Sequence, residues 1–214
     1  ESANDGSGQP TLLDPDGQNR LADLSAATTT ELIDHIVKTH HAYLWRELPR
    51  LSQFVTGLYW RHGATHPELA ELHIRFHRMK EEMEHHMFAE EEAIFPLIRQ
   101  TWLSGKPDGN PRTFFTIGEL EDDHSELIAK LRVIRDITVD CHLPDDAIET
   151  FRTTFRKLRE MEMDIQKHIH IESDLLFPKY RELAALDAIW RNDGPATRAR
   201  HFAFSAVLWT RVRQ

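Results

Sequence analysis

Apolar side chains recur every three or four residues along four long stretches of the chain, a period typical of amphipathic helices. No stretch shows the alternation of apolar and polar residues that a half-buried strand requires. The pattern predicts helices over about 29–62, 65–102, 113–139 and 143–183.

Helix-start sequences and breaks separate these stretches. Thr28 and Glu31 form a capping-box sequence before the first helix, and residues 65–68 combine a second capping box with an early proline. Gly, Pro, Asp and Asn residues predict a loop over 104–111, and residues 143–146 predict the start of the fourth helix. Pro49 predicts a kink in the first helix. Four long helices with short or moderate connections predict an all-α fold, an up-down-up-down four-helix bundle.

The two ends of the chain differ from this bundle, which we place at residues 25–183. Residues 1–24 are rich in Gly, Asp, Asn, Ser and Pro, which predicts a mobile tail. Residues 184–214 form a basic extension that ends in a short amphipathic stretch. We expect this extension to dock on the bundle or on a second subunit, which would make a dimer.

The charge balance narrows the range of partners. A formal net charge of −9 argues against nucleic acid or an anionic membrane as the main partner. No apolar run is long enough to span a bilayer. The single cysteine, Cys141, favours a reducing, cytoplasmic compartment. The chain begins with Glu1 rather than Met, so we expect it to be a processed or truncated product.

One motif occurs twice, near the ends of the second and fourth predicted helices. Residues 86–96 read HMFAEEEAIFP and residues 168–178 read HIHIESDLLFP, so both contain H-x-x-x-E-x-x-x-x-F-P. Residues four apart lie on one helix face, so each motif directs an imidazole and a carboxylate to the same side, within an apolar stripe. We expect the two Phe-Pro pairs to plug the core near a kink or a helix end.

A lone histidine matches each motif in the preceding helix. His124 has leucines at −4, +3 and +7, and His41 has apolar residues at the same offsets. His40 would instead place Glu47 and Arg50 on that stripe, so His41 is predicted to point inward. The chain therefore reads as two similar helical hairpins, and each supplies one lone His and one His-x-x-x-Glu.

These six side chains indicate a metal centre: His41, His86, Glu90, His124, His168 and Glu172. Buried carboxylates need compensating cations, and no Lys or Arg lies on these stripes near the motifs. Six ligands are too many for one tetrahedral zinc ion, but they suit two ions with bridging carboxylates. Imidazole and carboxylate favour iron, with manganese or zinc as alternatives, and an oxo or hydroxo bridge would leave a position open for a small ligand. A single His-x-x-x-Glu is usually a solvated pair, so the prediction depends on the repeat.

The remaining histidines are predicted to have no role in the site. His40, His85 and His170 neighbour predicted ligands and should face other helices or water. Six more are expected on the surface or in loops: His62, His66, His73, His77, His142 and His201.

Three acids beside the predicted ligands are candidates for a supporting role, and no catalytic residue is assigned. Glu82 and Asp164 lie one turn before His86 and His168, where a carboxylate either orients an imidazole, lines a path for protons and iron, or faces solvent at the rim. Asp123 is a weaker candidate because it adjoins His124 and points elsewhere on its helix.

With these motifs, about residues 29–180 resemble the hemerythrin-like HHE domain of the RIC (repair of iron centres) di-iron proteins. The segments that carry the resemblance are LIDHIVKTHHAYLWRELPRL, HHMFAEEEAIFP, ELEDDHSELIAKL and HIHIESDLLFP. The resemblance implies two non-haem irons bound by the six residues above, reactivity towards NO and O2, and restoration of iron–sulfur clusters after nitrosative or oxidative stress. It also implies that Glu82 matches a family acid beside the site.

The chain departs from the family pattern in several places. The small Cys-bearing N-terminal domain usual in the family is absent from this sequence, Leu44 stands where many members have a further His, and Asp123 stands where Glu is frequent. The basic extension is not part of the family core. Oxygen-carrying hemerythrins have a His-x-x-x-His pair and an Asp where this chain has its second His-x-x-x-Glu, so O2 transport is disfavoured.

Three functions remain open on the sequence. The favoured one is a di-iron stress protein that donates iron to damaged iron–sulfur proteins or reduces NO or O2. The second is a module that binds or senses O2, NO or iron without catalysis. The third is a structural bundle that holds zinc.

Overall fold

A computed structural model describes residues 24–104, 111–140 and 149–182. Most of the predicted tail, the basic extension and the start of the fourth predicted helix lie outside these residues, as does most of the 104–111 loop.

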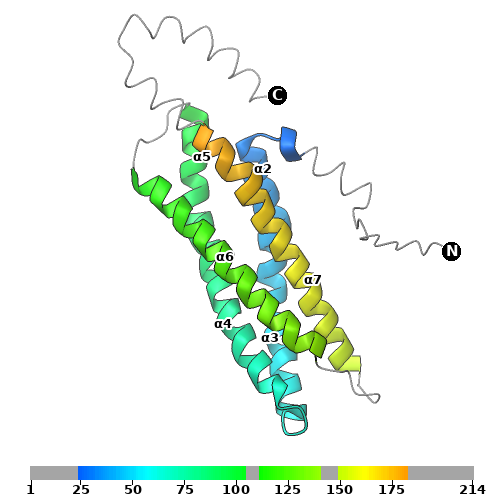
Figure 1. Ribbon diagram of the computed structural model, residues 1–214. Helices are drawn as coiled ribbons and strands as arrows, with labels where there is room; N and C mark the ends of the chain where they lie inside the picture. The colour runs from blue at the N-terminus through cyan, green and yellow to red at the C-terminus, as the bar shows by residue number, and fades with distance from the viewer. Residues whose placement is uncertain (1–23, 105–110, 141–148, 183–214) are drawn as a thin grey trace, which may run out of the picture.

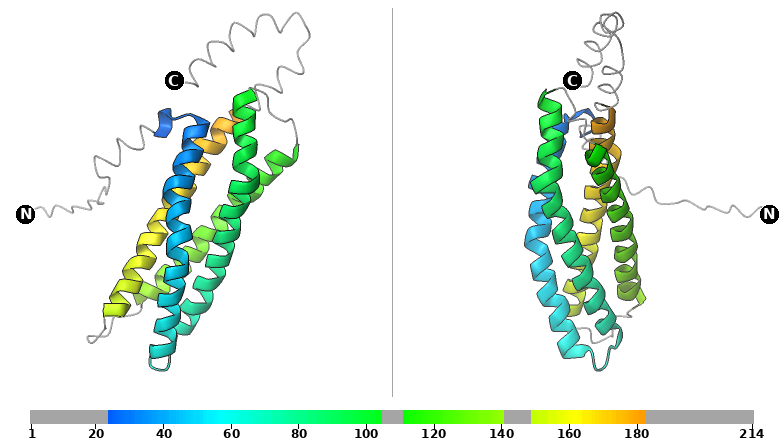
Figure 2. Two further views of the ribbon diagram at one scale, coloured as in Figure 1. Left: turned by 180° about the vertical axis from the view of Figure 1, so that it is seen from behind. Right: turned by 90° about the vertical axis from the view of Figure 1, so that its left-hand side faces the viewer.

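The described residues form an antiparallel bundle of four long helical rods (Figure 1). The rods, in chain order, are α2 (Thr29–His35), η1 (Ile36–His41) and α3 (Ala42–His62); α4 (Glu68–Ala89), η2 (Glu90–Ile94) and α5 (Phe95–Ser104); α6 (Pro111–Asp140); and α7 (Glu149–Ile171) with η3 (Glu172–Leu176), which stays helical to residue 182. α3 packs against α4 and α7, and α6 packs against the same two helices. The views in Figure 2 show this closed ring from two further sides. No strand occurs in the described ranges, so the predicted all-α bundle is confirmed.

The predicted start of the first helix is confirmed, and the predicted start of the second helix is wrong. The hydroxyl of Thr28 accepts a hydrogen bond from the Glu31 backbone N–H, and the Glu31 carboxylate accepts one from the Thr28 N–H. The second rod starts at Glu68, without a side-chain cap, because the Thr65 hydroxyl donates to the His62 carbonyl and closes the turn after α3. Pro49 lies inside α3, which remains helical through it.

Three π-helical segments interrupt the rods, and the sequence pattern did not predict them. In η1, η2 and η3 the closing N–H bonds a carbonyl five residues back: Ala42 to Val37, Phe95 to Glu90, and Phe177 to Glu172. A proline clashes with the carbonyl of the preceding turn, and a wider turn before Pro96 or Pro178 relieves that clash. Each Phe-Pro pair therefore directly follows a π turn within its rod, and both Phe side chains are buried in the core, as predicted. Single π turns are rare in helices and are frequent at functional sites.

The apolar core has two parts with a polar layer between them. A long cluster fills the bundle between α3, α4, α6 and α7, and a shorter one fills the end formed by α2, α5 and η3. Each rod passes from one cluster to the other over a few residues, between Ile36 and Leu44, Met87 and Ile94, Leu120 and Leu127, and Ile169 and Ile171. The predicted ligands all lie within these four crossing intervals or beside them.

Thr28→Ala should lower the free energy of unfolding by about 1 kcal/mol, because the substitution removes the hydroxyl that accepts a hydrogen bond from the Glu31 N–H. Urea denaturation at constant metal load measures the change. Thr39→Ala is the matched control, since its side chain is exposed within the same rod. A loss in the control as large as that in Thr28→Ala would contradict the capping role.

Candidate metal centre

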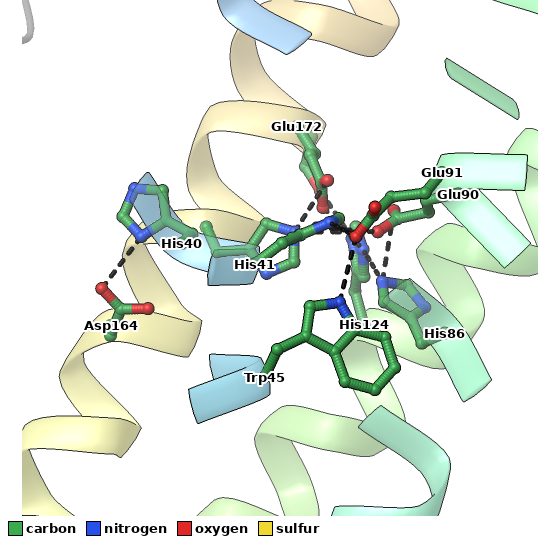
Figure 3. A network of polar contacts seen from close by, with 11 residues as sticks. His40, His41, Trp45, His86, Glu90, Glu91, His124, Asp164 and Glu172 are labelled. Atoms are coloured by element: carbon green, nitrogen blue, oxygen red, sulfur yellow. Dashed lines mark hydrogen bonds and ion pairs between the residues drawn. The ribbon is translucent and has the colours of Figure 1, made fainter. Parts of the chain in front are cut away.

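All six predicted ligands come together in the polar layer of the core. Figure 3 labels each of them except His168. His41 ends η1, His86 lies in α4, and His124 and His168 lie in α6 and α7. Glu90 and Glu172 are the first residues of η2 and η3. None of the six is more than 4% exposed, so two carboxylates and four imidazoles share one space closed to solvent.

The six residues form two overlapping groups that share both carboxylates. Site 1 consists of His41, His168, Glu90 and Glu172, and site 2 of His86, His124, Glu90 and Glu172. Within each group, one candidate ligand atom per residue lies within 4.8 Å of all the others.

Each carboxylate faces the two sites with different oxygens. Oε2 of Glu90 lies 3.4 Å from Nε2 of His41, while its Oε1 lies 3.2 Å from Nε2 of His86. Oε1 of Glu172 lies 2.8 Å from Nε2 of His168, while its Oε2 lies 3.2 Å from Nε2 of His124. This is the arrangement that a carboxylate bridging two cations requires.

Each site takes one histidine from each hairpin. The Nε2 atoms of His41 and His168 are 3.0 Å apart in site 1, and those of His86 and His124 are 3.2 Å apart in site 2. The lone His of one hairpin is thus paired with the motif His of the other. Neither hairpin alone contains both imidazoles of a site.

The donor set fits transition-metal ions. Neither oxygen of Glu90 accepts a hydrogen bond in the described structure, although the nitrogens of His86 and His41 are near, and Oε2 of Glu172 accepts none either. Buried carboxylate oxygens without donors are costly unless a cation compensates them. Imidazole nitrogen with carboxylate oxygen is a set that iron, manganese and zinc accept.

The charges in the cluster shift the pKa values of its members in opposite directions. Burial lowers the pKa of His86, but the carboxylates of Glu90 and Glu172 outweigh it and raise that pKa to about 9. The pKa of His41 is raised by the same balance of burial against Glu90. Burial raises the pKa of Glu90, but the surrounding imidazoles lower it well below its usual value, and the pKa of Glu172 is lowered in spite of burial and the Glu90 charge. A cation entering the cluster must therefore displace protons from imidazole.

Two residues outside the predicted set hold the lone histidines. Nδ1 of His41 lies 2.9 Å from Oε1 of Glu91, which also accepts a hydrogen bond from the indole of Trp45 at 3.1 Å. Nδ1 of His124 lies 3.0 Å from the hydroxyl of Ser173. The available sequence signal was positional, because Glu91 and Ser173 directly follow Glu90 and Glu172, and each contacts the lone histidine of its own hairpin.

His40 is buried beside site 1, which the sequence did not indicate. It is 4% exposed, its Nδ1 lies 2.9 Å from Oδ1 of Asp164, and its ring stacks over His168 at 6.0 Å between centroids. A π turn closes over one more residue than an α turn, so η1 brings consecutive histidines to the interior. Asp164 therefore supports His40 rather than a predicted ligand.

The other candidates lie away from the centre. Glu82 is exposed and forms an ion pair with Lys130, and Asp123 is exposed on α6. His85 and His170 are exposed, as predicted. His62 and His66 are half-buried against Phe151, and His73 and His77 contact hydroxyls of α3. His142 and His201 lie outside the described residues.

Within the ranges that the structure describes, no helix has the length and apolarity needed to cross a membrane.

Comparison with known proteins agrees with this geometry. Residues 32–180 match the family described as the Hemerythrin HHE cation binding domain. The chain is 30% identical over 158 residues to the iron-sulfur cluster repair protein YtfE of Escherichia coli O157:H7, covering 73% of this chain and 68% of the relative. It is 29% identical over 149 residues to the iron-sulfur cluster repair protein ScdA of Staphylococcus haemolyticus, covering 70% and 66%. A probable iron-sulfur cluster repair protein of Haemophilus influenzae is 26% identical over 163 residues, covering 76% and 70%.

The chain thus spans about two thirds of the length of these relatives. The family match covers all six clustered residues, the π turns that begin at Glu90 and Glu172, and the helices that position them. On fold, cluster and similarity together, this chain belongs to the hemerythrin HHE cation-binding family and, within it, to the iron–sulfur cluster repair proteins.

Proposed function

We propose that the chain binds two iron ions, one at each site, and that it helps to restore iron–sulfur clusters damaged by nitrosative or oxidative stress. The observation that carries the proposal is the pair of carboxylates, each of which offers one oxygen to each site. A structural zinc ion is held by four protein ligands in a closed tetrahedral site, and it does not require a carboxylate shared with a second ion. The names of the similar proteins supply the link to iron–sulfur repair.

The residues of the chain have separable tasks in this proposal. The four imidazoles and two carboxylates would hold the ions. The apolar clusters on both sides of the polar layer exclude bulk water. Glu91 and Ser173 orient the lone histidines. Iron bound here would supply a one-electron redox couple and would react with a small ligand such as NO or O2.

Damaged iron–sulfur proteins are the proposed partners, and the cytoplasm is the proposed location. The role in repair is compatible with iron donation and with removal of NO, because both require the same ligands. A module that only senses O2 or NO has less support, since the similar proteins are named for repair.

The function is tested with an iron–sulfur enzyme inactivated by NO. Iron-loaded protein should restore its activity, and the Glu90→Ala/Glu172→Ala double variant, treated identically, should not, because it lacks both bridges. His85→Ala, with its exposed side chain, is the matched control and should restore activity. Equal recovery with the same concentration of free ferrous iron would contradict a specific role for the protein.

The ligand set predicts a distinct pattern of metal loss. Wild type should hold about two irons per chain. Glu90→Ala and Glu172→Ala should each weaken the binding of both ions, because each carboxylate faces both sites. Elemental analysis after desalting measures the content. His85→Ala and His170→Ala are the controls and should keep both irons. His40→Ala is unsuitable as a control because this side chain is buried beside site 1.

Metal loading should release protons at neutral pH. In the metal-free protein the pKa of His86 is raised to about 9, so its imidazole is protonated below that value and must lose its proton to bind a cation. Affinity for ferrous iron should therefore rise as the pH is raised from 6 towards 9. Anaerobic calorimetry in two buffers of different ionisation heat measures the release. Identical heats in both buffers would show that the imidazoles are neutral before binding.

A further inference from the structure

The two sites differ in what supports their histidines. Positions 91 and 173 are equivalent in the two hairpins, since each directly follows Glu90 or Glu172 and contacts Nδ1 of the lone His in its own hairpin. At site 1 this partner is the carboxylate of Glu91, fixed by the Trp45 indole. At site 2 it is the neutral hydroxyl of Ser173.

The other surroundings increase this difference. His168 of site 1 is stacked by His40, which is held in turn by Asp164. His86 of site 2 has no hydrogen-bond partner for Nδ1 among the described residues, as is also true of His168. Asp123 is the acid outside the cluster that acts on His86, but it does so only through space and from an exposed position. The imidazoles of site 1 are fully buried, whereas His86 and His124 are 4% and 3% exposed.

A carboxylate that accepts the second N–H of a ligand imidazole makes that imidazole a stronger donor to a metal. Such an outer partner typically changes metal affinity by about 10–100-fold. A neutral hydroxyl forms a weaker hydrogen bond, without charge assistance. The single carboxylate at position 91 therefore favours metal at site 1 over site 2.

We propose that these outer contacts give the two sites unequal affinity for iron. Site 1 retains its iron, and site 2 holds the exchangeable iron that is delivered to a damaged cluster. This inference rests on the proposed function, and Glu91 and Ser173 are its positioning residues. The bridging carboxylates are common to both sites, so the difference must come from the residues behind the imidazoles.

Transfer of iron to a ferrous chelator tests the inference on the fully loaded, reduced protein. Wild type should release iron in two phases of about one iron each. Ser173→Asp adds the missing carboxylate and should slow the fast phase alone, by about tenfold. Ser173→Ala removes the contact and should accelerate the fast phase. Glu91→Ser should accelerate the slow phase by about tenfold or more, until the two phases merge.

Matched controls make the same charge changes at exposed side chains that do not contact the histidines. Glu92→Ser makes the same substitution at the exposed position next to Glu91, and Ser125→Asp adds a carboxylate at an exposed position next to His124. Both should keep the wild-type phases. Circular dichroism and iron content before mixing show whether each variant is folded and loaded.

The outcomes separate this inference from the proposed function. The inequality would be overturned if wild type released both irons in a single phase. It would also be overturned if the fast phase changed in Glu91→Ser but not in Ser173→Asp or Ser173→Ala. Either result would leave the di-iron proposal intact. A loaded protein with one iron or none would overturn the proposed function itself.

Discussion

The placement of two carboxylates in the middle of an apolar bundle is the constraint on which the rest of the structure depends. Glu90 and Glu172 are fully buried, and each presents its oxygens to opposite sides. Such groups are costly unless cations or imidazolium compensate them, so the helices must bring four imidazoles to the same level. The division of the core into two apolar clusters follows from this, because these polar side chains lie between them.

The π turns determine which residues of the helical rods face the centre. A bundle of regular α-helices repeats its inward positions at fixed intervals, which gives few consecutive inward residues. In this protein a wider turn starts at each bridging Glu and ends at Phe95 or Phe177, so the residue after each Glu also reaches a histidine. Each Phe-Pro pair thus bears on the centre through the π turn that precedes it, while its Phe side chain fills the core.

The sequence allowed the four helices, the direction of the bundle and all six clustered residues to be predicted, because these depend on local periodicity and on a motif that is present twice. His40 and Glu91 could not be placed in this way. Their positions depend on π turns, and a π turn shifts the inward register by one residue without changing the composition of the helix. The start of α4 was missed for a related reason, since the Thr65 hydroxyl bonds backward to His62 instead of capping forward.

Because each site takes one histidine from each hairpin, neither site can be complete until both hairpins have been synthesised. His41 and His86 leave the ribosome first, in one hairpin, but they belong to different sites, and each must wait for His168 or His124 from the second hairpin. A nascent chain that has made only its first hairpin can offer no complete site to a passing ion. Under the proposed function, iron acquisition would therefore follow the packing of the second hairpin, and occupancy of the centre would distinguish finished chains from truncated ones.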